Sequence, residues 1–234
     1  MIILALDTSS DACSVALLND DVCHAEFVVE ARAHTRLILP MIEQVLKQAG
    51  VELKAVDALA FGRGPGAFTG VRIATGIVQG LALAADKPVL PTSTLAAIAQ
   101  QAYLQQQAQA TRVLVAVDAR MGEVYWGRYE LVDGIMQLQG EELVIAPQDA
   151  PLPDSDQQWF GAGSGWREHA DVLKPRFEVC VKQINDDYLP AAEYIAQLAA
   201  KAWQRGEAVD AELAQPVYLR NKVAQTTRER AMKN

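Results

Sequence analysis

Residues 61–72, FGRGPGAFTGVR, form the stretch of this sequence most suggestive of ligand chemistry, because four glycines fall within twelve positions. Glycine-rich turns ahead of a helix can bind phosphate through their backbone N–H groups. The stretch lacks the Lys-Ser/Thr pair of a P-loop, and although its GxGxxA spacing meets a relaxed dinucleotide fingerprint, Pro65 inside the turn argues against that use. Two interpretations stay open. One is an anion site at the start of a helix over 70–85, and the other is a tight connection in which Gly64 and Gly66 allow positive φ and close packing.

Two aspartates end apolar runs that are typical of strands, Asp7 in IILALD and Asp118 in VLVAVD. In sugar kinases and actin relatives, hairpins of this kind wrap the phosphates of a nucleotide, and a glycine closely follows the aspartate. Ser9 and Arg120 stand near the places where such a glycine is expected. We therefore favour turn-forming aspartates over magnesium ligands. The residues that would line a cleft between the two hairpins are Asp7, Thr8, Ser9, Gly64, Gly66, Asp118, Arg120 and Glu123.

Other catalytic patterns are absent from the sequence. The three histidines form no HExxH or HxxxH pair, no GxSxG elbow is present, and the three cysteines show no CxxC spacing. Two enzymatic alternatives remain: an actin-like small-molecule kinase or ATPase that uses Asp7 and Asp118 with magnesium, and a ribonuclease H-like nuclease. The nuclease needs several converging acidic groups, and these two fall short.

Composition bounds the class of protein. The 234 residues are half apolar and carry a formal net charge of −8, which is typical of a globular protein and argues against nucleic-acid binding as its sole role. The start MIILALDTSS has no basic flank and is interrupted by Asp7, so it predicts a strand and not a signal peptide. The apolar run 73–85 is shorter than the roughly 20 residues of a membrane span. We expect a cytoplasmic protein that does not enter a membrane.

The elements that must position these residues follow a ribonuclease H-like order. Three antiparallel strands are predicted first, then a helix that Thr35 caps and Gly50 ends, and then alternating strands and helices. Ser93 is expected to cap the last of these helices. The predicted ranges are strands 2–8, 12–18, 22–29, 56–61 and 87–90, and helices 35–49, 70–85 and 93–107.

The chain then starts again, because residues 113–134 parallel residues 2–21 strand for strand and aspartate for aspartate. Two related halves of this type predict an α/β protein of actin-like ATPase architecture with an abbreviated second half. We expect an N-terminal subdomain over 1–107, a C-terminal subdomain over 108–215, which ends with an amphipathic helix over 190–206, and a C-terminal segment over 216–234.

The helix over 70–85 is apolar on nearly every side, so more than one of its faces must be covered. Gly76, Gly80 and Ala84 recur every four residues and make a flat ridge that invites close approach by another helix. Internal packing and contact with another molecule are equally good explanations of this ridge.

The C-terminal segment is basic in an acidic protein. After position 215 it holds five basic residues and one acidic residue, a formal charge of +4 before the terminal carboxylate. PVYLR, residues 216–220, has apolar anchors and is expected to dock on the protein. For the remainder, a solvated end is the simpler interpretation, and contact with tRNA is the alternative.

Five stretches together resemble the TsaB family, also called YeaZ, in its gammaproteobacterial form: ILALDTSSDACSVAL, HTRLILPMI, FGRGPGAFTGVRIATGIVQGLALA, AVDARMGEVYW and PVYLRN. The resemblance runs from end to end and implies an actin-like (ASKHA) fold. It also implies a non-catalytic role in making threonylcarbamoyladenosine beside the anticodon of tRNAs that read codons beginning with A. TsaD, the related transferase that carries paired metal-binding histidines, and the ATPase TsaE would be the partners. Together they move threonylcarbamoyl from threonylcarbamoyl-AMP to tRNA. ATP, ADP and magnesium would belong to those partners, and this chain would bind no catalytic metal of its own.

In this family the protein associates with itself and with TsaD through the two N-terminal helices. Carried onto this sequence, the expected interface residues are Thr35, Leu39, Ile42, Arg72, Ile73, Gly76, Ile77, Gly80, Leu81 and Ala84. We expect the homodimer and the TsaD heterodimer to compete for this surface, because one small-residue ridge can hold one close partner. Arg63 and Arg72, which flank the glycine loop, are expected to hold the loop or to touch the partner.

Overall fold

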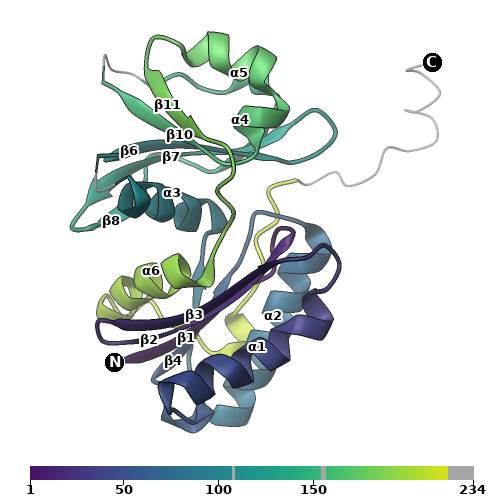
Figure 1. The fold of residues 1–234 in the computed structure, drawn as a ribbon, viewed down its shortest axis with the longest axis vertical. Helices are drawn as coiled ribbons and strands as arrows, with labels where there is room; N and C mark the ends of the chain where they lie inside the picture. The colour runs from purple at the N-terminus through teal and green to yellow at the C-terminus, as the bar shows by residue number, and fades with distance from the viewer. Residues whose placement is uncertain (107–108, 154–156, 221–234) are drawn as a thin grey trace, which may run out of the picture.

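The protein has two lobes, each built on one β-sheet, in a computed structural model that describes residues 1–106, 109–153 and 157–220 (Figure 1). The basic residues that follow Arg220 lie outside the described residues, as does the expectation that they contact tRNA.

The sheet of the first lobe has the strand order β3-β2-β1-β4-β5. The first three strands are antiparallel, and β4 and β5 run parallel to β1. This is the ribonuclease H-like order predicted from the sequence. The strands are β1 (Ile2–Asp7), β2 (Ala12–Asn19), β3 (Val22–Val29), β4 (Ala58–Gly62) and β5 (Val89–Thr92).

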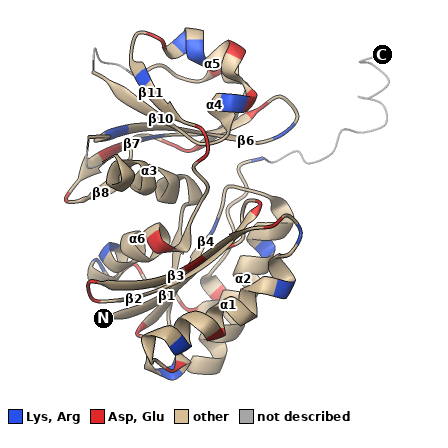
Figure 2. Cartoon of the chain, viewed as in Figure 1, with Lys and Arg blue, Asp and Glu red and all other residues tan. Residues whose placement is uncertain are grey.

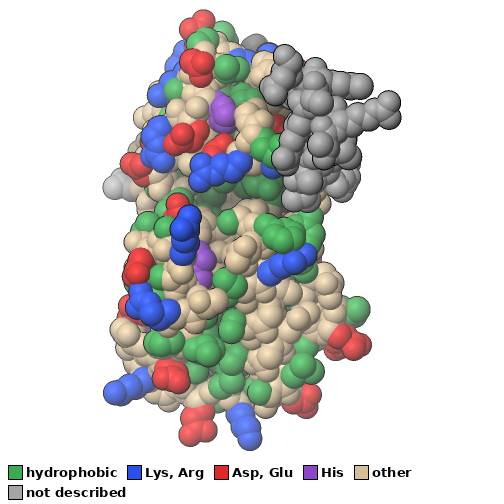
Figure 3. Space-filling model, turned by 90° about the vertical axis from the view of Figure 1, so that its right-hand side faces the viewer, with side chains coloured by type: hydrophobic (Ala, Val, Ile, Leu, Met, Phe, Trp, Pro, Cys, Tyr) green, Lys and Arg blue, Asp and Glu red, His purple; other side chains and the backbone are tan. Residues whose placement is uncertain are grey.

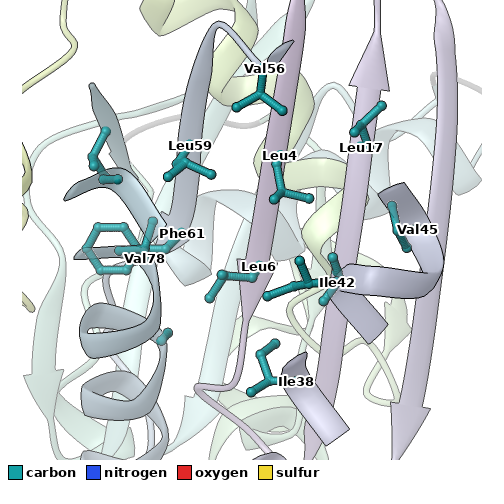
Figure 4. Close-up of a cluster of buried hydrophobic side chains, with 14 of the residues drawn as sticks. Leu4, Leu6, Leu17, Ile38, Ile42, Val45, Val56, Leu59, Phe61 and Val78 are labelled. Atoms are coloured by element: carbon teal, nitrogen blue, oxygen red, sulfur yellow. The ribbon is translucent and has the colours of Figure 1, made fainter. Parts of the chain in front are cut away.

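Helices α1 (His34–Ala49) and α2 (Phe68–Ala85) lie side by side on one face of this sheet (Figure 1). Figure 4 shows the core between these helices and the sheet, where Leu4, Leu6 and Leu17 of the sheet contact side chains of both helices. Gly50 ends α1 in the left-handed conformation, as predicted. The predicted cap is wrong, because α1 begins before Thr35 and Ala33 stands at the N-cap position without a side-chain hydrogen bond. A single 3₁₀ turn, Leu53–Ala55, leads into β4.

The second sheet repeats the strand arrangement of the first, with the order β11-β10-β6-β7-β8. An additional strand, β9, also pairs with β7. Strand β6 pairs antiparallel with β7 and parallel with β10, as β1 does with β2 and β4. Asp7 and Asp118 therefore end equivalent central strands, as predicted. The strands are β6 (Arg112–Asp118), β7 (Val124–Val132), β8 (Ile135–Leu138), β9 (Leu143–Ile145), β10 (Trp159–Ala162) and β11 (Val181–Asn185).

The second lobe is abbreviated in its helices. Where the first lobe has α1 and α2, the second has β9 with the 3₁₀ turn Pro147–Asp149, and the short helices α4 (Gly165–Glu168) and α5 (Ala170–Phe177). Its core relies instead on large aromatic side chains, with Trp126, Trp166 and Phe177 packed together.

Helices α3 (Thr94–Gln105) and α6 (Ala192–Gln204) lie between the two sheets (Figure 1), and each covers the sheet of the other half of the chain. Leu95 and Ile98 of α3 pack in the core of the second sheet, whereas Ile195 and Ala199 of α6 pack on the first. The structure thus corrects the expected division at 107/108 for both helices. Chain order cannot anticipate such an exchange, because each helix buries its apolar face against whichever sheet lies opposite. Ser93 caps α3, as predicted, by accepting hydrogen bonds from two backbone N–H groups of its first turn.

Candidate functional sites: the aspartate turns and the exposed face of α2

The glycine loop packs on the turn between β1 and β2. A Cβ atom at Gly66 would lie 2.5 Å from the carbonyl oxygen of Ser9, and one at Gly70 would lie 1.8 Å from that of Thr8. Two hydrogen bonds fasten the same contact: Ala67 N donates to Ser9 O at 2.7 Å, and Thr8 Oγ1 donates to Gly70 O at 2.7 Å. The close-packing interpretation of these glycines is confirmed, because only glycine leaves room for the backbone beneath.

Asp7 lies buried under this loop. Its Oδ1 accepts hydrogen bonds from the backbone N and the Oγ of Ser9, both at 2.9 Å. Its Oδ2 has no hydrogen-bond partner among the described residues and would lie 1.8 Å from a Cβ at Gly62. Burial raises the pKa of this carboxyl to about 7, against the smaller opposing effect of the bonds from Ser9. The residue shapes the turn, as the favoured interpretation holds.

Asp118 shapes the equivalent turn of the second lobe. Its Oδ1 accepts from the backbone N of Arg120 at 3.0 Å and lies 3.4 Å from His169 Nε2, and its Oδ2 pairs with the Arg120 guanidinium at 3.1 Å. The turn continues through positive φ at Arg120, Met121 and Gly122. In the described parts of the chain, no three His, Cys, Asp or Glu side chains gather as metal ligands would. The hydrogen bonds that Asp7 accepts from the backbone N of Ser9, and Asp118 from that of Arg120, show that both aspartates form turns.

Two more of the expected cleft residues contact the C-terminal segment. A Cβ at Gly64, where φ is +98°, would lie 2.9 Å from Val217 O. The carboxylate of Glu123 pairs with Arg220. Docking of residues 216–220, predicted from their apolar anchors, is confirmed.

The ridge on α2 is open to solvent. Gly76, Gly80 and Ala84 are exposed, and a Cβ atom placed on either glycine would meet nothing within 4 Å. Internal packing therefore does not explain the ridge among the residues that the structure describes. Leu83 extends the same surface and is 74% exposed. The length and composition of α2 would also suit a membrane span, but this is weak evidence, because a core helix of a globular protein passes the same test.

The other expected interface residues divide by burial. Thr35, Leu39 and Arg72 are exposed. Ile73 is half-buried, as are Ile77 and Leu81, which pack against the edge of the core. Ile42 is a correction: it is 3% exposed and packs with Leu6 and Ile38 in the core (Figure 4). Its place on the inner side of α1 removes it from any contact surface.

Sequence reasoning missed three exposed apolar residues of this region: Phe68, Leu83 and Tyr218. Leu83 could have been found, since it stands three residues after Gly80 and seven after Gly76 and so shares their helix face. Figure 3 shows a surface of hydrophobic and uncharged side chains across the middle of the lower lobe, with charged groups mostly around it. Figure 2 shows the same scarcity of charge on α2, whose sole charged residue is Arg72.

Arg72 contacts the glycine loop and residue Tyr218 through its side chain, whereas Arg63 is bonded through its backbone, and its side-chain Nε has no hydrogen-bond partner among the described residues. Arg72 Nε donates to Tyr218 OH at 2.9 Å, and its guanidinium lies 3.8 Å from the centre of the Phe68 ring. The backbone of Arg63 bonds to Thr92 and to Val217. Contact of either arginine with a partner stays a prediction.

Comparison with known proteins agrees with this geometry. A family model described as TsaD, tRNA N6-adenosine threonylcarbamoyltransferase, matches residues 28–161. The protein "tRNA threonylcarbamoyladenosine biosynthesis protein TsaB" of Escherichia coli K12 is 44% identical over 227 residues, 96% of each chain. The protein of the same name from Haemophilus influenzae is 40% identical over 231 residues, 94% of each chain. The solved structure of YeaZ from Pseudomonas aeruginosa is 50% identical and superposes with a TM-score of 0.84 over 93% of this chain and 99% of that one.

Two sheets of the same strand order, each with an aspartate turn at the end of its central strand, define an α/β protein of the actin-like (ASKHA) class. The relatives narrow this class further, since they match almost the whole chain at 40% identity or more. The chain belongs to the TsaB family.

Proposed function

We propose that this chain is a non-catalytic assembly subunit in the formation of threonylcarbamoyladenosine on tRNAs that read codons beginning with A. We propose this modification because its TsaB relatives are named as biosynthesis proteins of threonylcarbamoyladenosine. In this proposal TsaD transfers threonylcarbamoyl from threonylcarbamoyl-AMP to the adenosine beside the anticodon. TsaE is the ATPase of the assembly. This chain contacts tRNA indirectly, through the complex, and the modification takes place in the cytoplasm.

The observation that carries the proposal is the open ridge of α2. A helix with a single charged residue keeps Gly76, Gly80 and Leu83 exposed, although each is of a type that packs well against another helix. Small residues let two helix backbones approach closely, and an adjoining apolar surface adds the burial that stabilises a complex. The proposed occupants are a second copy of this chain when it is alone, and TsaD in the working complex.

The aspartate turns support the non-catalytic part of the proposal. Asp7 lies beneath the glycine loop, and the loop packs its own backbone on Thr8 and Ser9. We therefore assign ATP, ADP and magnesium to the partner subunits, and we expect the isolated protein to show no magnesium-dependent kinase, ATPase or nuclease activity. Turnover of ATP by the purified wild type that is lost in Asp118→Asn would favour the kinase alternative instead.

The test is the mass of the purified protein, alone and mixed with TsaD, for wild type and Gly80→Leu. A Cβ at position 80 meets nothing within 4 Å, so a larger side chain starts there without a clash, and leucine raises the ridge. We expect wild type to form a homodimer alone and a heteromer with TsaD. The variant should do neither, with at least a tenfold loss of affinity, equivalent to about 1.4 kcal/mol.

Gln204→Leu is the matched control, because it places the same side chain at an exposed position near the end of α6. It should associate as wild type does. Normal association of Gly80→Leu would move the interface away from α2. A wild type that ignores TsaD would remove the assembly role itself.

A further inference from the structure

Residues 216–220 form a short segment, here named the C-terminal clasp, that runs from the first lobe to the second (Figure 1). Its first anchor is the glycine loop. Val217 N donates to Arg63 O at 2.8 Å, and Val217 O lies so close to Gly64 that a Cβ there would approach it to 2.9 Å. Because this contact joins two backbones, it fixes the position of Val217 relative to the glycine loop.

The second anchor is an aromatic cluster at the start of α2. The ring centres of Tyr218 and Phe68 lie 5.4 Å apart, within the range of a favourable aromatic pair. The hydroxyl of Tyr218 accepts the hydrogen bond from Arg72, whose guanidinium also lies over the Phe68 ring. A cation over an aromatic face adds electrostatic attraction to this packing.

The third anchor lies on the other lobe. Arg220 donates to the carbonyl oxygen of Arg120 at 3.2 Å and to Met121 Sδ at 3.6 Å, and its guanidinium pairs with the Glu123 carboxylate. The side chain of Arg220 is 18% exposed, so this ion pair is better shielded from water than the surface pairs that contribute little to stability.

The two ends of the clasp connect the two aspartate turns. The glycine loop that holds Val217 is itself fastened to the turn that follows Asp7, and Arg220 binds the turn that follows Asp118. The lobes also meet at α3 and α6, where Gln105 Nε2 donates to Tyr194 OH at 3.0 Å. The clasp is therefore a second connection between the lobes, separate from α3 and α6 and made beside the two aspartate turns.

We propose that the C-terminal clasp is a conformational lock, which holds the two lobes closed and bars the space between the aspartate turns until Arg220 leaves the turn at 120–123. The lock is a property of the single chain and does not rest on the proposed function.

The experiment measures the distance between the lobes in the full-length protein. Spin labels are attached at Arg32→Cys and Lys174→Cys, one exposed site on each lobe, after the three native cysteines are replaced by alanine. Mixed with an excess of unlabelled protein, so that only distances within one chain contribute, the labelled parent protein should give one narrow distance distribution. Arg220→Gln should broaden this distribution and shift it, and adding Tyr218→Ala should enlarge the shift. Circular dichroism checks that each variant stays folded.

Arg205→Gln is the matched control. It removes the same charge from an ion pair with Glu207, which lies within the first lobe near the end of α6. We expect it to leave the distribution unchanged. Distributions that stay narrow and unshifted in both clasp variants would overturn the lock, as would an equal shift in Arg205→Gln.

Discussion

A carboxyl group buried as fully as that of Asp7 resists ionisation, because the charged form loses its hydration. Ser9 returns part of that cost through two hydrogen bonds to Oδ1, but Oδ2 has no partner among the described residues. Desolvation is the larger effect, and it raises the pKa of Asp7 to about 7. The first aspartate turn is thus held by a side chain that changes charge near neutral pH.

Asp7→Asn tests this burial through the pH dependence of stability. The folded protein holds its proton up to about pH 7, whereas the unfolded chain releases it near pH 4, so ionisation destabilises wild type as the pH rises between these values. The full effect is on the order of 4 kcal/mol, from about 3 pKa units at 1.36 kcal/mol each. Asparagine has the same shape and no charge. Urea unfolding at pH 5 and pH 8 should therefore show a smaller loss of stability in Asp7→Asn than in wild type.

Equal pH slopes in the two proteins would contradict the burial of a titrating carboxyl. A variant that unfolds at both pH values would show instead that the buried site does not accommodate an amide NH2 group in place of Oδ2.

The types of these residues were predictable from sequence, but their surroundings were not. A strand that ends in aspartate, followed by hydroxyl residues, predicts a turn at Asp7 because the pattern is local. What lies above that turn is Gly62, contributed by another strand and brought there by sheet pairing. The same limit explains Ile42, since a helical spacing marks an apolar face and does not say whether a sheet or a partner covers it.

At the scale of elements, α2 contains glycines of two kinds. Gly70 in its first turn is buried against the backbone of Thr8, whereas Gly76 one and a half turns later is exposed on the ridge. Both have helical conformation in the same helix, so they allow an internal comparison of packing against helix propensity.

Gly70→Ala and Gly76→Ala should change stability in opposite directions. The Cβ at position 70 would lie 1.8 Å from a carbonyl oxygen, an overlap that the backbone must relieve, and we expect a loss of about 2 kcal/mol or more. The Cβ at position 76 meets nothing, and alanine there should add about 0.5 to 1 kcal/mol by restricting the unfolded chain. Urea unfolding at one low protein concentration, where self-association contributes little, gives both values. A gain at position 70 would contradict the close packing of the glycine loop.

Element order was the most predictable feature of this fold. Strand alternation, the cap at Ser93 and the stop at Gly50 are local signals, and the structure has each of them. The start of α1 was not predicted correctly, because Ala33 at the N-cap position has no capping side chain that sequence patterns could detect. The short elements of the second lobe, β9, α4 and α5, also escaped prediction, since they are too brief to show a period.

At the scale of the whole molecule, the exchange of α3 and α6 sets the limit of sequence reasoning. Both helices have apolar residues that must be buried, and both bury them against a sheet from the other half of the chain. The internal repeat predicted two lobes correctly, but a repeat only compares segments. It says nothing about which lobe a connecting helix covers once both sheets are present.

Competition between the homodimer and the TsaD heterodimer is a prediction about the molecule as a whole. The first lobe has one ridge of small residues, on α2, and close helix contact at Gly76 and Gly80 leaves no room there for a second helix. Native mass spectrometry of the protein at a fixed concentration, with TsaD added in steps, should show the homodimer decline as a one-to-one heterodimer rises. In Gly80→Leu both species should be weak at every step, whereas Gln204→Leu should follow wild type. An assembly that keeps two copies of this chain in contact through α2 while TsaD is bound would contradict a shared surface, because the two contacts would then occupy different faces.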